Sequence, residues 1–168
     1  MEKASDLSRR SFLTGHRRET AAPISPFRPP WLRKDVASAC TGCGSCADAC
    51  PTGVIRIVGE TATLDFTQGE CTFCGACAEI CPEDLFDLAV KPFDHVVEIA
   101  GTCLTYAGVT CRSCGDACPE LAIRFVPRIG GPFLPEVDSS ACTGCGACIA
   151  PCPVGATGLS PMREAADA

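Results

Sequence analysis

The spacing of its cysteines constrains the fold of this 168-residue chain more than any other feature. Three segments repeat the pattern Cys-x2-Cys-x2-Cys-x3-Cys-Pro, and a fourth carries the variant Cys-x7-Cys-x2-Cys-x3-Cys-Pro. The 16 cysteines form four groups in chain order: group 1 is Cys40, Cys43, Cys46 and Cys50; group 2 is Cys71, Cys74, Cys77 and Cys81; group 3 is Cys103, Cys111, Cys114 and Cys118; group 4 is Cys142, Cys145, Cys148 and Cys152. No cysteine is left over, which indicates a ligand system.

Three kinds of cysteine chemistry compete for these groups. Disulfides are typical of exported chains, and the close spacing within each group makes the required Cα separations awkward. A tetrahedral zinc site usually combines two separate Cys-x2-Cys pairs, so a third cysteine two residues further on would be surplus. The spacing is instead that of bacterial [4Fe–4S] loops. Groups 1, 2 and 4 therefore predict three [4Fe–4S] clusters, with all of their cysteines as metal ligands.

Group 3 predicts a fourth [4Fe–4S] cluster, although its spacing is irregular. By ligand count, Cys103 comes first, and Cys111 and Cys114 take the second and third positions. By local sequence, Cys111 instead opens a run that lacks its third cysteine, with Gly115 in the position of the usual glycine. Both interpretations need Cys103 from upstream to complete a set of four ligands.

Glycines and prolines at fixed places support the cluster interpretation. Gly44, Gly75 and Gly146 each follow the second cysteine of a regular group, where a tightly wrapped loop needs backbone angles open mainly to glycine. A proline follows the fourth cysteine of every group and favours an extended backbone at that cysteine. In proteins with two such clusters, the fourth cysteine binds the other cluster. We expect the same exchange of ligands here.

The groups recur at a nearly constant interval, with 20, 21 and 23 residues between them. Such an interval is typical of duplicated modules. Apolar segments predict short strands at residues 54–58, 63–66, 85–90, 96–99 and 121–126. The segments around the third and fourth cysteines predict one or two helical turns, at residues 47–49, 76–80 and 147–150.

These elements predict an α+β fold made of tandem βαββαβ units of the bacterial-ferredoxin type, stapled by clusters. We expect one two-cluster unit at residues 36–95 and a second at residues 96–160. In an alternative arrangement the pairs are nested, so that group 1 joins group 4 and group 2 joins group 3. Residues 1–35 are predicted to be a basic, proline-rich tail, and residues 161–168 a C-terminal tail.

Charge divides the chain unevenly. Residues 1–38 carry a net charge of +4, whereas the remainder carries −10 and holds every cysteine. An acidic body repels phosphates, which disfavours a nucleic-acid partner and favours a protein with a basic docking face. The sequence has no run of 18 apolar residues, so it predicts no membrane span.

Few other residues suggest chemistry of their own. Residues 8–13, Ser-Arg-Arg-Ser-Phe-Leu, are similar to the start of a twin-arginine export signal, but polar and charged residues follow instead of an apolar stretch. We therefore expect a chain that is not exported. Trp31 is expected to be a hydrophobic peg on the domain surface, and His95 a surface or capping residue. Because no catalytic set or phosphate loop is visible, the sequence predicts no enzyme and no catalytic residues.

Over residues 36–160 the chain resembles the bacterial-type ferredoxin superfamily. The head at residues 8–15, the Arg-Pro-Pro-Trp segment at residues 28–31, three regular groups and an irregular third group resemble the NapF family of ferredoxin-type proteins. That resemblance implies a cytoplasmic protein that acts on the molybdenum-containing catalytic subunit of periplasmic nitrate reductase before its export. It also implies a role in maturation of that subunit, including assembly of its own iron–sulfur cluster.

Two other functions compete with this interpretation. The chain could be a generic polyferredoxin electron carrier or the electron-transfer subunit of another oxidoreductase, which shares all of the cluster chemistry and differs only in partner. It could also be a purely structural metal domain, which reversible bleaching by dithionite would exclude.

Overall fold

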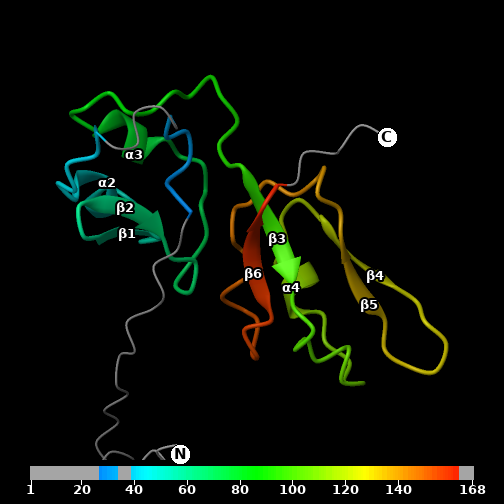
Figure 1. The fold of residues 1–168 in the computed structure, drawn as a ribbon. Helices are drawn as coiled ribbons and strands as arrows, with labels where there is room; N and C mark the ends of the chain where they lie inside the picture. Colours follow the sequence, from blue (N-terminus) through cyan, green and yellow to red (C-terminus); the bar gives the residue numbers. More distant parts are fainter. Residues whose placement is uncertain (1–26, 34–38, 163–168) are drawn as a thin grey trace, which may run out of the picture.

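The computed structural model describes residues 27–33 and 39–162. The expectations for the export-like head and most of the basic tail lie outside these residues. Figure 1 shows two lobes, one carrying the first two helices and the first hairpin and the other carrying the remaining elements. The elements are α2 (Ser45–Asp48), β1 (Ile55–Val58), β2 (Thr61–Leu64), α3 (Ala76–Glu79), β3 (His95–Ile99), α4 (Ser113–Asp116), β4 (Ile123–Val126), β5 (Leu134–Val137) and β6 (Thr157–Pro161).

We call the part with α2, β1, β2 and α3 the first unit, and the part with β3 to β6 and α4 the second unit. Each unit contains one antiparallel hairpin between its two cysteine groups: β1 with β2, and β4 with β5. β3 precedes group 3 and β6 follows group 4, and these two strands pair antiparallel with Ile99 opposite Thr157. The second unit is thus closed by a five-residue ladder that joins its two ends. The α+β arrangement of tandem ferredoxin-like units is confirmed.

The first unit is closed differently. Its ends meet at one isolated bridge, between Leu32 and Phe86, flanked by backbone hydrogen bonds from Arg33 N–H to the Leu85 carbonyl (3.0 Å) and from Asp87 N–H to the Trp31 carbonyl (2.9 Å). The predicted strand at residues 85–90 is therefore wrong. The Asp87 carboxylate accepts the Ala89 N–H (2.9 Å), and this local turn ends the extended segment.

The helices are single turns placed close to where the spacing predicts them. α2 and α3 follow Gly44 and Gly75, whose φ angles are +87° and +80°, as expected for glycine after the second cysteine. The predicted helical turn at residues 147–150 is wrong as a helix, because this segment forms turns, with the Ile149 N–H bonded to the Gly146 carbonyl (3.0 Å). The group 4 loop therefore ends without a regular helix.

Two small cores support the units. The core of the first unit is built around Val54, Leu64, Phe66 and Phe93, and the smaller core of the second unit around Val97 and Ile123, together with buried cysteines in both. Ile149 packs against both cores. The hydrophobic contacts therefore continue from one unit into the other.

His95 is buried at 4% exposure, so the expectation of a surface residue is wrong. Its ring lies 4.5 Å from that of Phe93 and 4.8 Å from that of Phe27, centroid to centroid. Phe93 lies in the core of the first unit, and His95, the first residue of β3, packs its ring against that of Phe93 and is buried with it.

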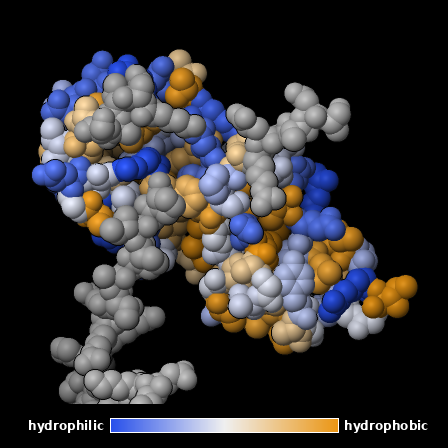
Figure 2. All heavy atoms as spheres, in the orientation of Figure 1, coloured by the Kyte–Doolittle hydropathy of each residue, from blue (hydrophilic) through white to orange (hydrophobic). Residues whose placement is uncertain are grey.

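Apolar side chains also remain on the surface. Figure 2 shows them gathered over the visible face of the second unit, and the exposed ones include Val109, Leu121, Ile129 and Phe133. Across the part of the chain that the structure describes, no helix has the length and apolar character needed to cross a membrane.

Candidate iron–sulfur sites

The cysteines line four cavities, with four thiols around each. Site I is lined by Cys40, Cys43, Cys46 and Cys81; site II by Cys50, Cys71, Cys74 and Cys77; site III by Cys103, Cys111, Cys114 and Cys152; and site IV by Cys118, Cys142, Cys145 and Cys148. Every site combines the first three cysteines of one group with the fourth cysteine of another. This is the exchange that the Cys-Pro pattern predicts.

The exchange also settles which groups lie together. Groups 1 and 2 trade their fourth cysteines, Cys50 and Cys81, and groups 3 and 4 trade Cys118 and Cys152. Consecutive groups are therefore paired, and the nested alternative is wrong. The hairpin inside each unit is what turns the chain back so that the paired loops face one another.

The irregular third group adopts the arrangement given by ligand count. Cys114 is the second residue of α4, just as Cys46 and Cys77 are the second residues of α2 and α3. Gly115 lies inside α4, where a Cβ would overlap the Phe125 ring, so it is a packing glycine and not the loop glycine. Cys103 joins the site from upstream and is buried at 9% exposure.

In groups 2 and 4 the third cysteine is the one that is buried. Burial raises the pKa of Cys77 to about 12, with a further contribution from the neighbouring Cys71 and Cys46. Burial also raises the pKa of Cys148 to about 12, and Cys145 and Cys142 add to the effect. Such thiols ionise readily only beside a cation. The donor set therefore fits a positively charged iron–sulfide core bound by thiolates.

The fourth cysteines of groups 3 and 4 accept backbone hydrogen bonds. The Ala122 N–H donates to the Cys118 sulfur (3.3 Å), and the Ala156 N–H donates to the Cys152 sulfur (3.1 Å). Burial alone would raise the pKa of Cys152, but hydrogen bonds from the backbone around Ala156 lower it overall. Donors aimed at a ligating sulfur favour its thiolate form and tune a cluster bound to it.

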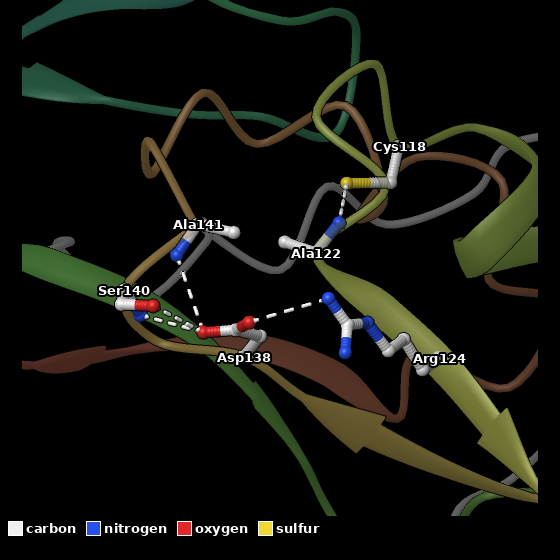
Figure 3. Close-up of polar contacts among 6 residues, drawn as sticks. All are labelled: Cys118, Ala122, Arg124, Asp138, Ser140 and Ala141. Atoms are coloured by element: carbon white, nitrogen blue, oxygen red, sulfur yellow. Dashed lines mark hydrogen bonds and ion pairs between the residues drawn. The ribbon is translucent and has the colours of Figure 1, made fainter.

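An aspartate at the end of each hairpin holds the next cysteine loop. In Figure 3 the Asp138 carboxylate faces Arg124 (3.7 Å) and accepts the Ser140 N–H (3.0 Å) and hydroxyl (2.6 Å). Asp65 accepts the same pair of bonds from Thr67, at 3.0 and 2.7 Å. Sequence reasoning missed these residues, although Asp-x-Ser/Thr before a group is the signature of a turn closed by an aspartate side chain.

The cavities suit an extended group better than a single ion. Within residues 27–33 and 39–162, no three His, Cys, Asp or Glu side chains converge tightly enough to hold one metal ion. Each set of four thiols instead lines a cavity of its own. A [4Fe–4S] cube takes one thiolate at each of its four iron corners, so spaced thiols around a cavity fit it.

Comparison with known proteins gives the same chemistry. A family model described as a 4Fe-4S dicluster domain matches residues 39–85 and 109–156. The ferredoxin-type protein NapF of Escherichia coli K12 is 41% identical over 155 residues, covering 90% of this chain and 93% of that protein. NapF of Haemophilus influenzae is 41% identical over 143 residues, which is 82% of this chain and 81% of that protein.

A more distant relative is the methylamine utilization ferredoxin-type protein MauM of Paracoccus denitrificans. It is 34% identical over 160 residues, covering 81% of this chain and 71% of that protein. The residues matched by the family model hold groups 1, 2 and 4 in full and every cysteine of group 3 except Cys103. The chain therefore belongs to the NapF family of ferredoxin-type proteins, and it is an iron–sulfur protein that binds multiple [4Fe–4S] clusters.

Proposed function

We propose that this chain is a cytoplasmic accessory protein that supplies electrons, or a cluster, to the catalytic subunit of periplasmic nitrate reductase during maturation, before that subunit is exported. In this proposal all 16 cysteines are ligands, four at each of the sites I to IV. The electron-transfer part of this proposal is supported by four cavities that are each lined by four thiols. The resemblance to the NapF family carries the choice of partner.

When bound, a [4Fe–4S] cluster gains or loses one electron at a time. The chain's own residues make that exchange workable. The cysteine thiolates would hold each cluster, and the N–H groups of Ala122 and Ala156, which donate to the sulfurs of Cys118 and Cys152, would stabilise negative charge there. Phe125 lines site III, and the guanidinium of Arg112 lies over its ring, 4.7 Å from the ring centroid, which places a positive charge next to a residue that lines the site.

The surface supports a protein partner. The cysteine-bearing part of the chain is strongly acidic, and charge complementarity with a basic face speeds association and weakens as salt is added. Exposed apolar residues over the second unit, such as Ile129 and Phe133, add the kind of surface that interaction sites use.

Retention of the nitrate reductase catalytic subunit by the anaerobically prepared protein tests the proposal. We expect retention at low salt and weaker retention at high salt. A variant lacking residues 1–26 is the informative deletion, because residues 31–33 hydrogen-bond with the first unit and must stay. This variant should keep its clusters and lose the subunit. No retention of the subunit by the full chain at either salt concentration would contradict the proposed partner.

A generic polyferredoxin electron carrier is the second candidate. It is favoured by the 34% identity to a protein named for methylamine utilization, which indicates that the same cluster framework serves a different system. A generic carrier should reduce an artificial acceptor equally well with or without residues 1–26, and it should not retain the nitrate reductase subunit.

A further inference from the structure

We infer that electrons pass between the two units through one contact, the hydrogen bond from the Cys71 N–H to the Cys145 carbonyl oxygen, which we call the junction. Phe66 and His95 are the residues that position this junction. The inference rests on the proposed function, because it requires Cys71 and Cys145 to be cluster ligands at sites II and IV. It goes further in naming the route and the residues that hold it.

The first observation is the contact between the two ligand loops. The Cys71 N–H donates to the Cys145 carbonyl over 2.8 Å. Cys71 lines site II in the first unit, and Cys145 lines site IV in the second. The path from one sulfur to the other therefore consists of the two cysteines' own covalent bonds and a single hydrogen bond. Electron tunnelling is faster across such a path than across a gap of solvent.

The second observation is that the residues on both sides of Cys145 are closely packed, Gly146 against the first unit and Gly144 against His95 at the start of β3. Gly146 has a φ of +81°, and a Cβ at this position would overlap the ring of Phe66, which is buried at 4% exposure in the core of the first unit. At Gly144 a Cβ would lie 2.8 Å from the His95 carbonyl oxygen and 2.9 Å from its Cδ2. Only glycine permits both approaches.

His95 completes the clamp. Its Nε2 lies 3.0 Å from the Gly144 carbonyl oxygen, and because a carbonyl only accepts, Nε2 carries the hydrogen and donates it. The ring is fixed among Phe27, Phe93 and Phe66, at centroid distances of 4.8, 4.5 and 6.4 Å. Phe66 and His95 thus hold Gly146 and Gly144, and these glycines hold the Cys145 carbonyl in place for Cys71.

The equivalent glycines of the first unit show that a cluster loop does not need this packing. Gly44 and Gly75 have φ angles of +87° and +80°, close to that of Gly146, but no atom lies within 4 Å of the position that a Cβ would take. The loop conformation after the second cysteine is therefore shared, whereas the close approach at this position belongs to the junction. This difference supplies a matched control.

The step itself is an internal exchange that balances without another reactant. One electron leaves the reduced group at site II, which is oxidised by one electron, and enters the group at site IV, which is reduced by one electron; no proton moves and no bond is made or broken. With sites I and II in one unit and sites III and IV in the other, the order along the route is I, II, IV, III.

The test uses the full-length, anaerobically reconstituted protein and compares Gly146→Ala with Gly44→Ala. Both variants place a side chain at a positive φ, but only Gly146→Ala meets Phe66. A ruthenium photoreductant on a Glu83→His variant, also carrying His16→Gln, would deliver one electron beside site I, which Glu83 lines. Freeze-quenched EPR would then follow its arrival in the second unit, whose signals are assigned from a Cys145→Ala variant.

We expect Gly146→Ala to slow this arrival by an order of magnitude or more and to increase hydrogen exchange of the Cys71 amide, with iron content unchanged. Gly44→Ala places the same backbone strain in the loop of site I but meets no neighbouring atom, so it should leave the hydrogen exchange of the Cys71 amide unchanged. Should Gly146→Ala fail to load iron, His95→Phe keeps the aromatic packing while removing the hydrogen bond to Gly144. It should give the same changes to a smaller degree.

Two outcomes would overturn the inference. An unchanged arrival rate in a variant whose Cys71 amide exchanges faster would show that electrons take another route. Equal slowing by Gly44→Ala and Gly146→Ala would show that the junction packing is irrelevant. A failure of the proposed function looks different, because the chain would then fail to bind the nitrate reductase subunit although transfer between its units remained intact.

Discussion

The two units hold similar sites on frames that are closed in different ways. Both have a hairpin, an arginine–aspartate pair across it, at 3.8 Å in the first unit and 3.7 Å in the second, and an exchange of fourth cysteines. The second unit joins its ends with the five-residue ladder of β3 and β6. The first unit does so with the single bridge of Leu32 and Phe86. Of the features of a unit, the ladder that joins its two ends is thus the one that cluster binding requires least.

The cores compensate for this difference. The first unit packs the aromatic residues Phe66 and Phe93 against aliphatic ones, whereas the second unit has the smaller core of Val97 and Ile123. Large aromatic side chains bury the most area per residue. The first unit therefore relies on aromatic packing where the second relies on a ladder, and both rely on the clusters because neither core is large.

Removal of iron should have the largest effect on both units, and the two units should respond to it differently. Metal binding in small domains is coupled to folding, so chelation under anaerobic conditions should abolish cooperative unfolding. We expect amides of the first unit to exchange fully, while those of β3 and β6 keep part of their protection. Hydrogen exchange followed by mass spectrometry measures this. An apo protein that unfolds as cooperatively as the loaded one would contradict it.

The next largest effect tests the exchange of fourth cysteines in the second unit. Cys152→Ala should empty site III and leave site IV, because Cys152 lines the cavity of Cys103, Cys111 and Cys114. Iron content should fall by about four per chain. The EPR signal that disappears should be the one lost in Cys103→Ala. Loss of the signal that Cys142→Ala removes would mean that each group binds its own cluster.

A smaller effect tests the closure of the first unit. The Trp31 ring packs edge-on against that of Phe73 (6.1 Å between centroids), and its backbone bonds with Pro92 and Asp87. Trp31→Ala should lower the free energy of unfolding of the first unit by about 2 kcal/mol, less than the loss of a fully buried Trp because the residue is only half-buried. Chemical denaturation of the loaded protein measures this. Tyr106→Ala, at an exposed position of the second unit, is the control and should change little.

The smallest effect compares equivalent turns after the fourth cysteine. Leu121 has a φ of +51°, and glycine stands at the corresponding positions of groups 1 and 4, where Gly53 and Gly155 have φ angles of +63° and +59°. Since Leu121 is 72% exposed, its side chain contributes little burial. Leu121→Gly should stabilise the protein by about 1 kcal/mol in thermal or chemical unfolding. Leu121→Ala keeps the strain and should not stabilise it; equal stabilisation by both variants would refute the strain argument.

The sites were predictable from the sequence to a large extent, because most of their geometry is local. Three cysteines within seven residues and a left-handed glycine such as Gly44 define a loop, and the Cys-Pro step predicts where the fourth ligand goes. The strand expected at residues 85–90 failed because its partner comes from residues 31–33, a segment too short and too remote for a local pattern to reveal. The division of the chain between residues 95 and 96 stays a prediction that separate expression of the units would test.

The junction between the units was not predictable, because it depends on contacts between residues far apart in the chain. The sequence around Phe66 and the sequence around Gly146 give no sign that these two residues meet. Nothing in the sequence near Cys71 indicates that its amide donates to Cys145. His95 was misjudged for the same reason, since its surroundings of Phe27, Phe66 and Phe93 come from three segments. Local spacing therefore predicts how a cluster is held, and tertiary packing decides how one cluster faces another.

Iron and sulfide analysis of the anaerobically purified chain, combined with EPR after dithionite reduction, tests the central claim most directly. Four sites of four thiols predict ~16 iron and ~16 sulfide ions per chain and EPR signals of reduced [4Fe–4S] clusters. A colourless protein, stoichiometric zinc, or cysteines paired as disulfides would contradict the account.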